Sequence, residues 1–478
     1  MAGVVPKRRL LALQSKLSVL QLETTAWRQD SQDAAARFAL HHSQIAEVCE
    51  GIDELHKLLS KEVGGLQPDA PLAAVESLER RILAAVQIWD TYRAKWSLRV
   101  QAGLRQALDL IDDLAWQAYR PAHDLALASG WLPADRARLP PLVFTNPRWS
   151  PFARSRERGY ELDEGSGLLQ EIDDFEPYLR TMPVPLIGIP WTQAGHLPDA
   201  VFVGHEVGHL VEDDLGLEEA LRAAVDAALP EADDARRQAW SVHWRSEVFA
   251  DVWGVLCCGP AFAETLVDLL TGRPDVGTQA QPDAFGRWGS YPTHALRVAA
   301  LVAAVRALDD AEVPGVFALA ADRLAARWQQ AHPGTHAMSA FDGDAEAVVD
   351  ALMHTPLTAF KRSREGDPLS VRQVLLFSEQ MQDDAEKDAT EALALHAPLS
   401  SDVRTLFAGQ AMAFARDPAA FGPREVQQRF IGRLLQRRTQ GLRAKEMAAL
   451  QAARPKEDDR RAAAASAFRA LFDPPAGH

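Results

Sequence analysis

Cysteine is scarce in this chain, with three among 478 residues. Cys257 and Cys258 are adjacent and Cys49 stands alone, so they do not form the spaced pattern of a disulfide framework. This scarcity favours a reducing compartment, and we expect a cytoplasmic protein. The adjacent pair lies in the apolar run VWGVLCCGPAFA, where it is expected to be buried as two small hydrophobic side chains.

Long uninterrupted apolar runs are also missing. The two longest candidates, residues 252–263 and 296–308, are shorter than a membrane-spanning helix. The N-terminus carries basic residues but has neither the apolar core nor the cleavage site of a signal peptide. Positive charge is in the minority, with a net charge of −15, which argues against a general binder of nucleic acids or anionic membranes. We therefore expect neither a nucleic-acid partner nor a membrane partner.

Apolar residues at helical spacing dominate the first 130 residues. They step by three and four in three segments, at residues 10–20, 45–59 and 75–96. This spacing predicts a helical bundle or coiled-coil-like region over residues 1–130. Self-association through these helices is possible, although an intramolecular bundle is the commoner outcome. We expect His41 and His42 to lie on its surface, and we assign no chemistry to the region.

The character of the sequence changes after residue 130, where prolines mark loops. Short runs that favour extended structure occur at residues 142–145 and 159–162. A third run, MPVPLIGIP at residues 182–190, is apolar and contains prolines. Since proline cannot donate a backbone hydrogen bond to a neighbouring strand, this run is predicted to be an edge strand, able to pair with the backbone of a substrate. The sequence predicts a small sheet here.

The motif HEVGH follows this sheet, within residues 201–216. In a helix, His205 and His209 lie one turn apart on one face, a spacing that lets two imidazoles bind one zinc ion. Glu206 lies beside that face and can hold a water molecule. Gly216 is a suitable end for the helix. The alternative is a surface helix in which two histidines share this spacing by chance.

A second long helix is predicted over residues 230–258. In this helix His243, Glu247 and Asp251 recur at one-turn spacing, among apolar neighbours. Buried carboxylates require a positively charged or hydrogen-bonding partner. Zinc and a zinc-bound histidine would supply such partners, and His243 is the substitute ligand if Glu247 does not bind.

HEVGH followed by Glu247-x-x-Ala250-Asp251 resembles the gluzincin zinc metallopeptidases. The resemblance covers about residues 180–300, and the flanking helical regions match no subfamily. It implies an α+β fold, predominantly helical, in which a zincin-like catalytic core pairs a small sheet with an active-site helix. We assign this core to residues 131–310, a helical C-terminal region to 311–450 and a flexible tail to 451–478.

The resemblance also implies roles for individual residues. The zinc (Zn2+) ligands would be His205, His209 and Glu247. Glu206 would act as the general base, and Asp251 would orient one of the zinc-bound histidines. Three downstream residues have a less specific pattern and are candidates for stabilising the oxyanion: Tyr291, His294 and Arg297. They could equally be polar residues at the exposed start of a helix.

These expectations describe a zinc metallopeptidase that hydrolyses a peptide or protein substrate. Two alternatives remain open. One is a helical scaffold or binding protein with a structural or vestigial zinc site. The other is a zinc hydrolase that acts on a substrate other than a peptide.

Overall fold

The computed structural model describes most of the chain. The described residues are 4–32, 38–67, 70–133, 139–146, 151–154, 184–272, 288–289, 291–309, 315–333, 341–421 and 425–439. The run at 159–162 and the tail at 451–478 lie outside these ranges. Over the described part, the expected class is confirmed at a coarse level, because the chain is predominantly helical with a small sheet. None of the described helices combines the length and the apolar character needed to cross a membrane.

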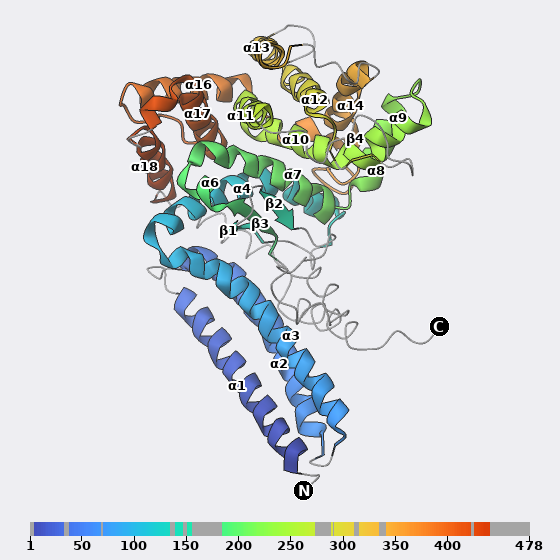
Figure 1. Cartoon of the computed structure of the whole chain (residues 1–478), viewed down its shortest axis with the longest axis vertical. Helices are drawn as coiled ribbons and strands as arrows, with labels where there is room; N and C mark the ends of the chain where they lie inside the picture. Colours follow the sequence, from blue (N-terminus) through green and yellow to red (C-terminus); the bar gives the residue numbers. More distant parts are fainter. Residues whose placement is uncertain are drawn as a thin grey trace.

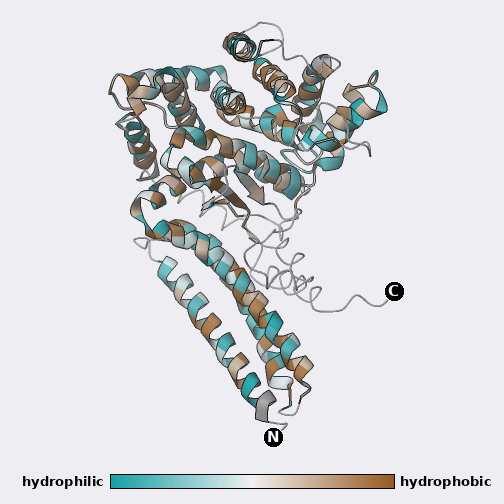
Figure 2. Cartoon of the chain, in the orientation of Figure 1, coloured by the Kyte–Doolittle hydropathy of each residue, from teal (hydrophilic) through white to brown (hydrophobic). Residues whose placement is uncertain are grey.

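Three long helices form an elongated arm that projects from a larger body, with the N-terminus at the far end (Figure 1). They are α1 (Val4–Gln32), α2 (His42–Gly65) and α3 (Leu72–Ser97). Apolar and polar residues alternate along them (Figure 2), and the residues at helical spacing, such as Leu17, Ile52 and Ile82, are buried. The expected surface position of His41 is wrong. Its side chain is only 1% exposed, because it packs at the joint between arm and body.

The body begins with α4 (Ala102–Ser129), which packs against the helix that carries HEVGH. The other helices are α6 (Trp191–Gly195), η4 (Leu197–Phe202), α7 (Val203–Asp214), α8 (Glu218–Ala228), α9 (Asp234–Gln238), η5 (Ala239–Trp244), α10 (Arg245–Cys258), α11 (Pro260–Thr271), α12 (His294–Arg306), α13 (Val316–Ala331), α14 (Asp342–His354), α15 (Val371–Val374), α16 (Glu379–Leu393), α17 (Val403–Arg416), η7 (Pro418–Phe421) and α18 (Glu425–Thr439). Two short helical turns, η1 (Ala39–His41) and η2 (Leu98–Val100), connect the arm helices and lead into α4.

A three-stranded sheet lies beside α7 near the arm. Its order is β1 (Leu142–Asn146), β3 (Leu186–Pro190), β2 (Phe152–Arg154). β3 runs parallel to β1 and antiparallel to β2. A separate antiparallel pair is formed by β4 (Pro356–Leu357) and β5 (Leu369–Ser370).

The edge-strand prediction for residues 182–190 is wrong, because β3 is the central strand of its sheet. Pro185 precedes the strand and Pro190 is its last residue, so the residues between them keep the N–H groups that a central strand needs. Both edges of β3 are paired over residues 186–188. The expectation that this segment pairs with a substrate backbone is therefore also wrong.

The two faces of the sheet contribute to different cores. Leu142 and Leu186 belong to the hydrophobic cluster of the arm. Val143 and Ile187, the next residue in each strand, belong to the large cluster of the body. Since successive side chains of a strand point to opposite faces, the sheet separates the two cores and is buried by both.

The site helices α7 and α10 pack closely against each other. An added Cβ at Gly208 would lie 2.7 Å from the Cα of Ala250, so only glycine allows this approach. The helical stretch predicted at 230–258 is observed from Asp234 onward, with a π-helical segment, η5, in the middle. Gly259 follows the last residue of α10, with a φ of 61°. Cys257 and Cys258 are buried, also as expected.

Candidate metal centre

Three side-chain atoms from two helices converge at one point beside the sheet. The Nε2 atoms of His205 and His209, both on α7, are 3.2 Å apart. Oxygens of Glu247 on α10 lie 3.5 Å from His205 Nε2 and 3.6 Å from His209 Nε2. Tetrahedral ligands with zinc bonds of about 2.0–2.2 Å lie roughly 3.4 Å apart. The separations observed without an ion are thus close to those of three ligands around one zinc.

Hydrogen bonds at the other ring nitrogens orient the two imidazoles. His205 Nδ1 lies 2.8 Å from Asp251 Oδ1, and because a carboxylate only accepts, Nδ1–H is the donor. His209 Nδ1 is 3.2 Å from the hydroxyl oxygen of Ser246, a group that can donate or accept. Burial favours the neutral ring of His205, but hydrogen bonds and charges from Asp251 and Glu247 raise the pKa of His205 to about 10. Both Nε2 atoms face the point where Glu247 also directs its carboxylate, and a cation bound there would replace the proton on Nε2 of His205.

Asp251 has a second partner that the sequence left undecided. Arg297 on α12 donates to both of its oxygens, at 2.6 and 2.8 Å. The guanidinium also lies 3.8 Å from Glu247 Oε2. Asp251 therefore connects His205 to α12, and one arginine compensates part of the negative charge of both carboxylates.

The electrostatics of Glu247 suit a metal ligand. Burial opposes its ionisation, but His209, His205 and Arg297 together lower the pKa of Glu247 to about 2. Its Oε2 atom is buried and has no close hydrogen-bond donor within the described part of the chain, with His205 Nε2 at 3.5 Å and the Arg297 guanidinium at 3.8 Å. An ionised oxygen in a protein interior is costly unless it is paired, so a cation bound at this point would stabilise it.

Glu206 has a different environment, although it is the neighbour of His205. Its side chain is 5% exposed, and burial is the main cause that raises the pKa of Glu206 to about 7. The backbone N–H of Ala153, on β2, donates a hydrogen bond to its carboxylate. The chain thus holds one carboxylate that stays ionised, Glu247, next to one whose proton affinity is close to neutral pH.

The two downstream oxyanion candidates, Tyr291 and His294, have fewer contacts with the site. Tyr291 is 38% exposed, and its ring centroid lies 5.6 Å from the guanidinium carbon of Arg297. The charge of Glu247 is the largest cause that raises the pKa of Tyr291 to about 12, which places the phenol near the ligands. His294 is the first residue of α12. Among the described residues, neither His294 nor His243 belongs to the group of converging ligand atoms.

Two contacts of the site could not be found from the sequence. Ser246 carries no motif signal, because serine next to glutamate is common in any helix. Arg297 was named only as an oxyanion candidate, and its bidentate contact with Asp251 could not be derived from a separation of 46 residues.

Comparison with known proteins gives no relative. No family model, curated protein or solved structure matches the chain. The function of the site has to be argued from its geometry.

Proposed function

We propose that the chain is a zinc metallopeptidase whose ligands are His205, His209 and Glu247. The convergence of two histidine Nε2 atoms and one carboxylate, with separations of 3.2 to 3.6 Å, carries this proposal. Among the described residues three protein ligands converge, which leaves a fourth position for water or substrate, as in catalytic zinc sites, whereas structural sites use four. This count favours an enzyme over a scaffold with a structural ion.

The donor set fits a borderline transition-metal ion such as zinc better than calcium or magnesium. Two imidazole nitrogens and one carboxylate oxygen suit such an ion, whereas calcium and magnesium prefer oxygen ligands alone. The buried Glu247 Oε2, which has no close hydrogen-bond donor among the described residues, supports a bound cation. Zinc bound here would supply Lewis acidity, polarising a carbonyl and lowering the pKa of a coordinated water.

The residues of the chain would carry the proton transfers. Glu206 accepts a proton from the attacking water and passes it to the leaving amine, a role for which a pKa of about 7 is well matched. Asp251 holds His205 in the tautomer that leaves Nε2 free. Tyr291, whose ring centroid lies 5.6 Å from the guanidinium carbon of Arg297, is the first candidate for the oxyanion donor. His294 remains the second candidate.

A peptide-library cleavage assay tests the proposal, with zinc measured in the same protein preparation by elemental analysis. We expect zinc in the purified chain and cleavage of library peptides, and His209→Ala should lose the cleavage together with the zinc ion of this centre. A chain that binds zinc and hydrolyses only esters or amides of small molecules would point to the non-peptide hydrolase. A carefully purified chain that contains no zinc would contradict the proposal.

A further inference from the structure

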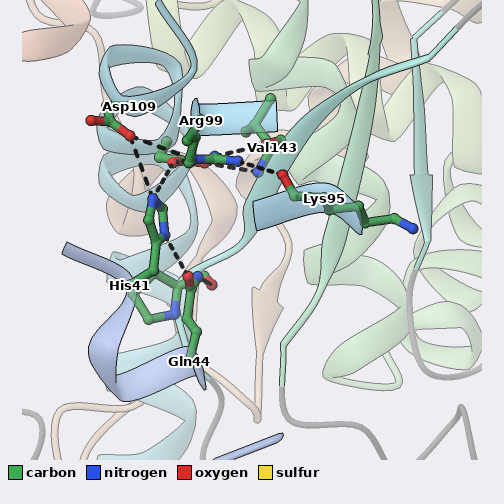
Figure 3. A network of polar contacts seen from close by, with 8 residues as sticks. His41, Gln44, Lys95, Arg99, Asp109 and Val143 are labelled. Carbon is green, nitrogen blue, oxygen red and sulfur yellow. Dashed lines mark hydrogen bonds and ion pairs between the residues drawn. The ribbon is translucent and has the colours of Figure 1, made fainter. Parts of the chain in front are cut away.

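A second buried cluster of metal-ligand types lies at the joint of arm and body. His41 ends η1, and Asp109 and Asp112 are on α4. Their side chains are 1%, 9% and 1% exposed. One nitrogen and two carboxylate oxygens from these residues lie within 4.8 Å of one another. Figure 3 shows His41 between Gln44 and Asp109, with Arg99 alongside.

The position of the proton on His41 follows from Gln44. The Nε2 of Gln44 donates to the carbonyl oxygen of Pro140 at 2.8 Å, which leaves its Oε1 facing His41 Nδ1 at 2.7 Å. An amide oxygen only accepts hydrogen bonds, so Nδ1 of His41 must be the donor. In a neutral ring the lone pair is then on Nε2.

That lone pair faces other acceptors. His41 Nε2 lies 3.4 Å from Asp109 Oδ1 and 3.8 Å from Asp112 Oδ2. In a neutral ring, the Nε2 lone pair and the two carboxylate oxygens would face one another in a buried space, an arrangement that a bound cation stabilises. The side-chain oxygen of Gln44 accepts the hydrogen bond from His41 Nδ1 and orients the ring. A metal-bound histidine usually donates its other ring N–H to an acceptor in this way.

Arg99 compensates only part of the negative charge. Its guanidinium donates to Asp112 Oδ2 at 2.7 Å and to the carbonyl oxygen of Val143 at 2.8 Å. It also lies 3.4 Å from Asp109 Oδ1. One guanidinium thus faces two buried carboxylates. A carboxylate oxygen has two lone pairs, so Asp112 Oδ2 can accept from Arg99 and still bind a cation.

We propose that His41 Nε2, Asp109 and Asp112 bind a divalent transition-metal ion of the Zn2+ or Mn2+ class. One imidazole and two carboxylates suit these ions. The ion would join η1, which belongs to the arm, to α4, which belongs to the body. This site is separate from the HEVGH centre and does not depend on the peptidase proposal.

Zinc stoichiometry in matched variants tests this second site. After saturation with Zn2+ and desalting, elemental analysis should find about two zinc ions per wild-type chain. His41→Ala and His209→Ala should each lose one ion, and the double variant should lose both. His354→Ala is the control, because His354 is exposed and pairs with Asp350 at 2.9 Å. It should retain two.

Asp109→Asn is a second variant that is expected to fold, because asparagine has nearly the same volume as aspartate. Its helical circular dichroism should match wild type while its zinc count falls by one. If His41→Ala and Asp109→Asn both fold and bind as much zinc as wild type, the second site does not exist, and His41 faces the carboxylates as an imidazolium. Loss of an ion in His41→Ala but not in His209→Ala would refute the peptidase centre and support the second site.

Discussion

Glu206 and Glu247 lie in one site, but their environments shift their pKa values in opposite directions. Glu247 is surrounded by His209, His205 and Arg297, which keep it ionised. Glu206 is dominated by burial, which raises its pKa. The first environment suits a ligand and the second suits a base, so substitutions at the two positions should have different effects.

Glu206→Gln should abolish turnover and spare the metal. Glutamine keeps nearly the same volume and can hydrogen bond, but it cannot accept a proton at neutral pH. Zinc content and folding should therefore match wild type, while peptide cleavage falls by about a hundredfold or more. The measurement is the cleavage rate, with zinc determined on the same samples.

Glu219→Gln is the matched control, because Glu219 is exposed on α8. It should cleave at the wild-type rate. Equal cleavage by Glu206→Gln and wild type would show that Glu206 is not the base, and the mechanism proposed here would fail.

Asp251→Asn should weaken zinc binding without abolishing it. The substitution removes the charge that holds His205 Nδ1 and leaves the buried Arg297 without its bidentate partner. Loss of such a supporting group costs roughly ten- to a hundredfold in metal affinity. Competition with a chelator measures this. An unchanged affinity would mean that His205 keeps its orientation without Asp251.

The convergence of the proposed ligands follows from residue spacing, whereas their supporting partners could not be predicted. His205 and His209 are four residues apart and so share one face of a helix, and Glu247 and Asp251 have the same spacing on a later helix. Arg297 and Ser246 act through tertiary contacts, which have no local pattern. The burial of His41 was missed for the same reason, since a histidine between two helices gives no periodic signal.

At the scale of elements, the contact between α7 and α10 sets the distance between the ligands. The histidines come from one helix and Glu247 from the other, and Gly208 brings the two backbones together. A side chain at this position must push the helices apart, because its nearest neighbour is backbone.

Gly208→Ala should therefore reduce both stability and zinc affinity. Overpacking of this kind costs about 1–3 kcal/mol, and separation of the helices moves Glu247 from the histidines. Gly103→Ala on α4 is the control, because its Cβ would have no neighbour within 4 Å. It should be neutral or stabilise by up to about 1 kcal/mol. Denaturant unfolding and zinc titration measure the two effects, and normal behaviour of Gly208→Ala would contradict the proposed coupling.

The sheet shows where reasoning from local sequence fails. Apolar runs identified two of its strands, but the prolines of the 182–190 run suggested an edge. The prolines instead flank the hydrogen-bonded part of β3. Strand order depends on which segments meet in three dimensions, and a single strand carries little information about it.

At the scale of the whole molecule, bound metal should stabilise the native chain. A ligand that binds only the folded state adds about 4 kcal/mol at a thousand times its Kd. Chelation should therefore lower the unfolding temperature of wild type by several degrees, which differential scanning fluorimetry measures. The double variant His41→Ala with His209→Ala should not respond to the chelator. An equal response in the double variant would mean that the stabilising ions bind elsewhere.

The helices of the arm could be predicted from the sequence, but their projection from the body could not. Regular apolar spacing extends from α1 through α4, yet α4 packs into the body against α7. Amphipathic spacing shows that a helix buries one face, and it does not show which partner covers that face.

The sheet that separates the two cores has a practical consequence for making fragments of this protein. A recombinant piece that starts at α4 and omits the arm would uncover Leu142 and Leu186, whose side chains face the arm's cluster. A sheet whose apolar face is exposed to solvent in this way is prone to aggregate. Any attempt to isolate the body should therefore keep the arm or replace those leucines with polar residues.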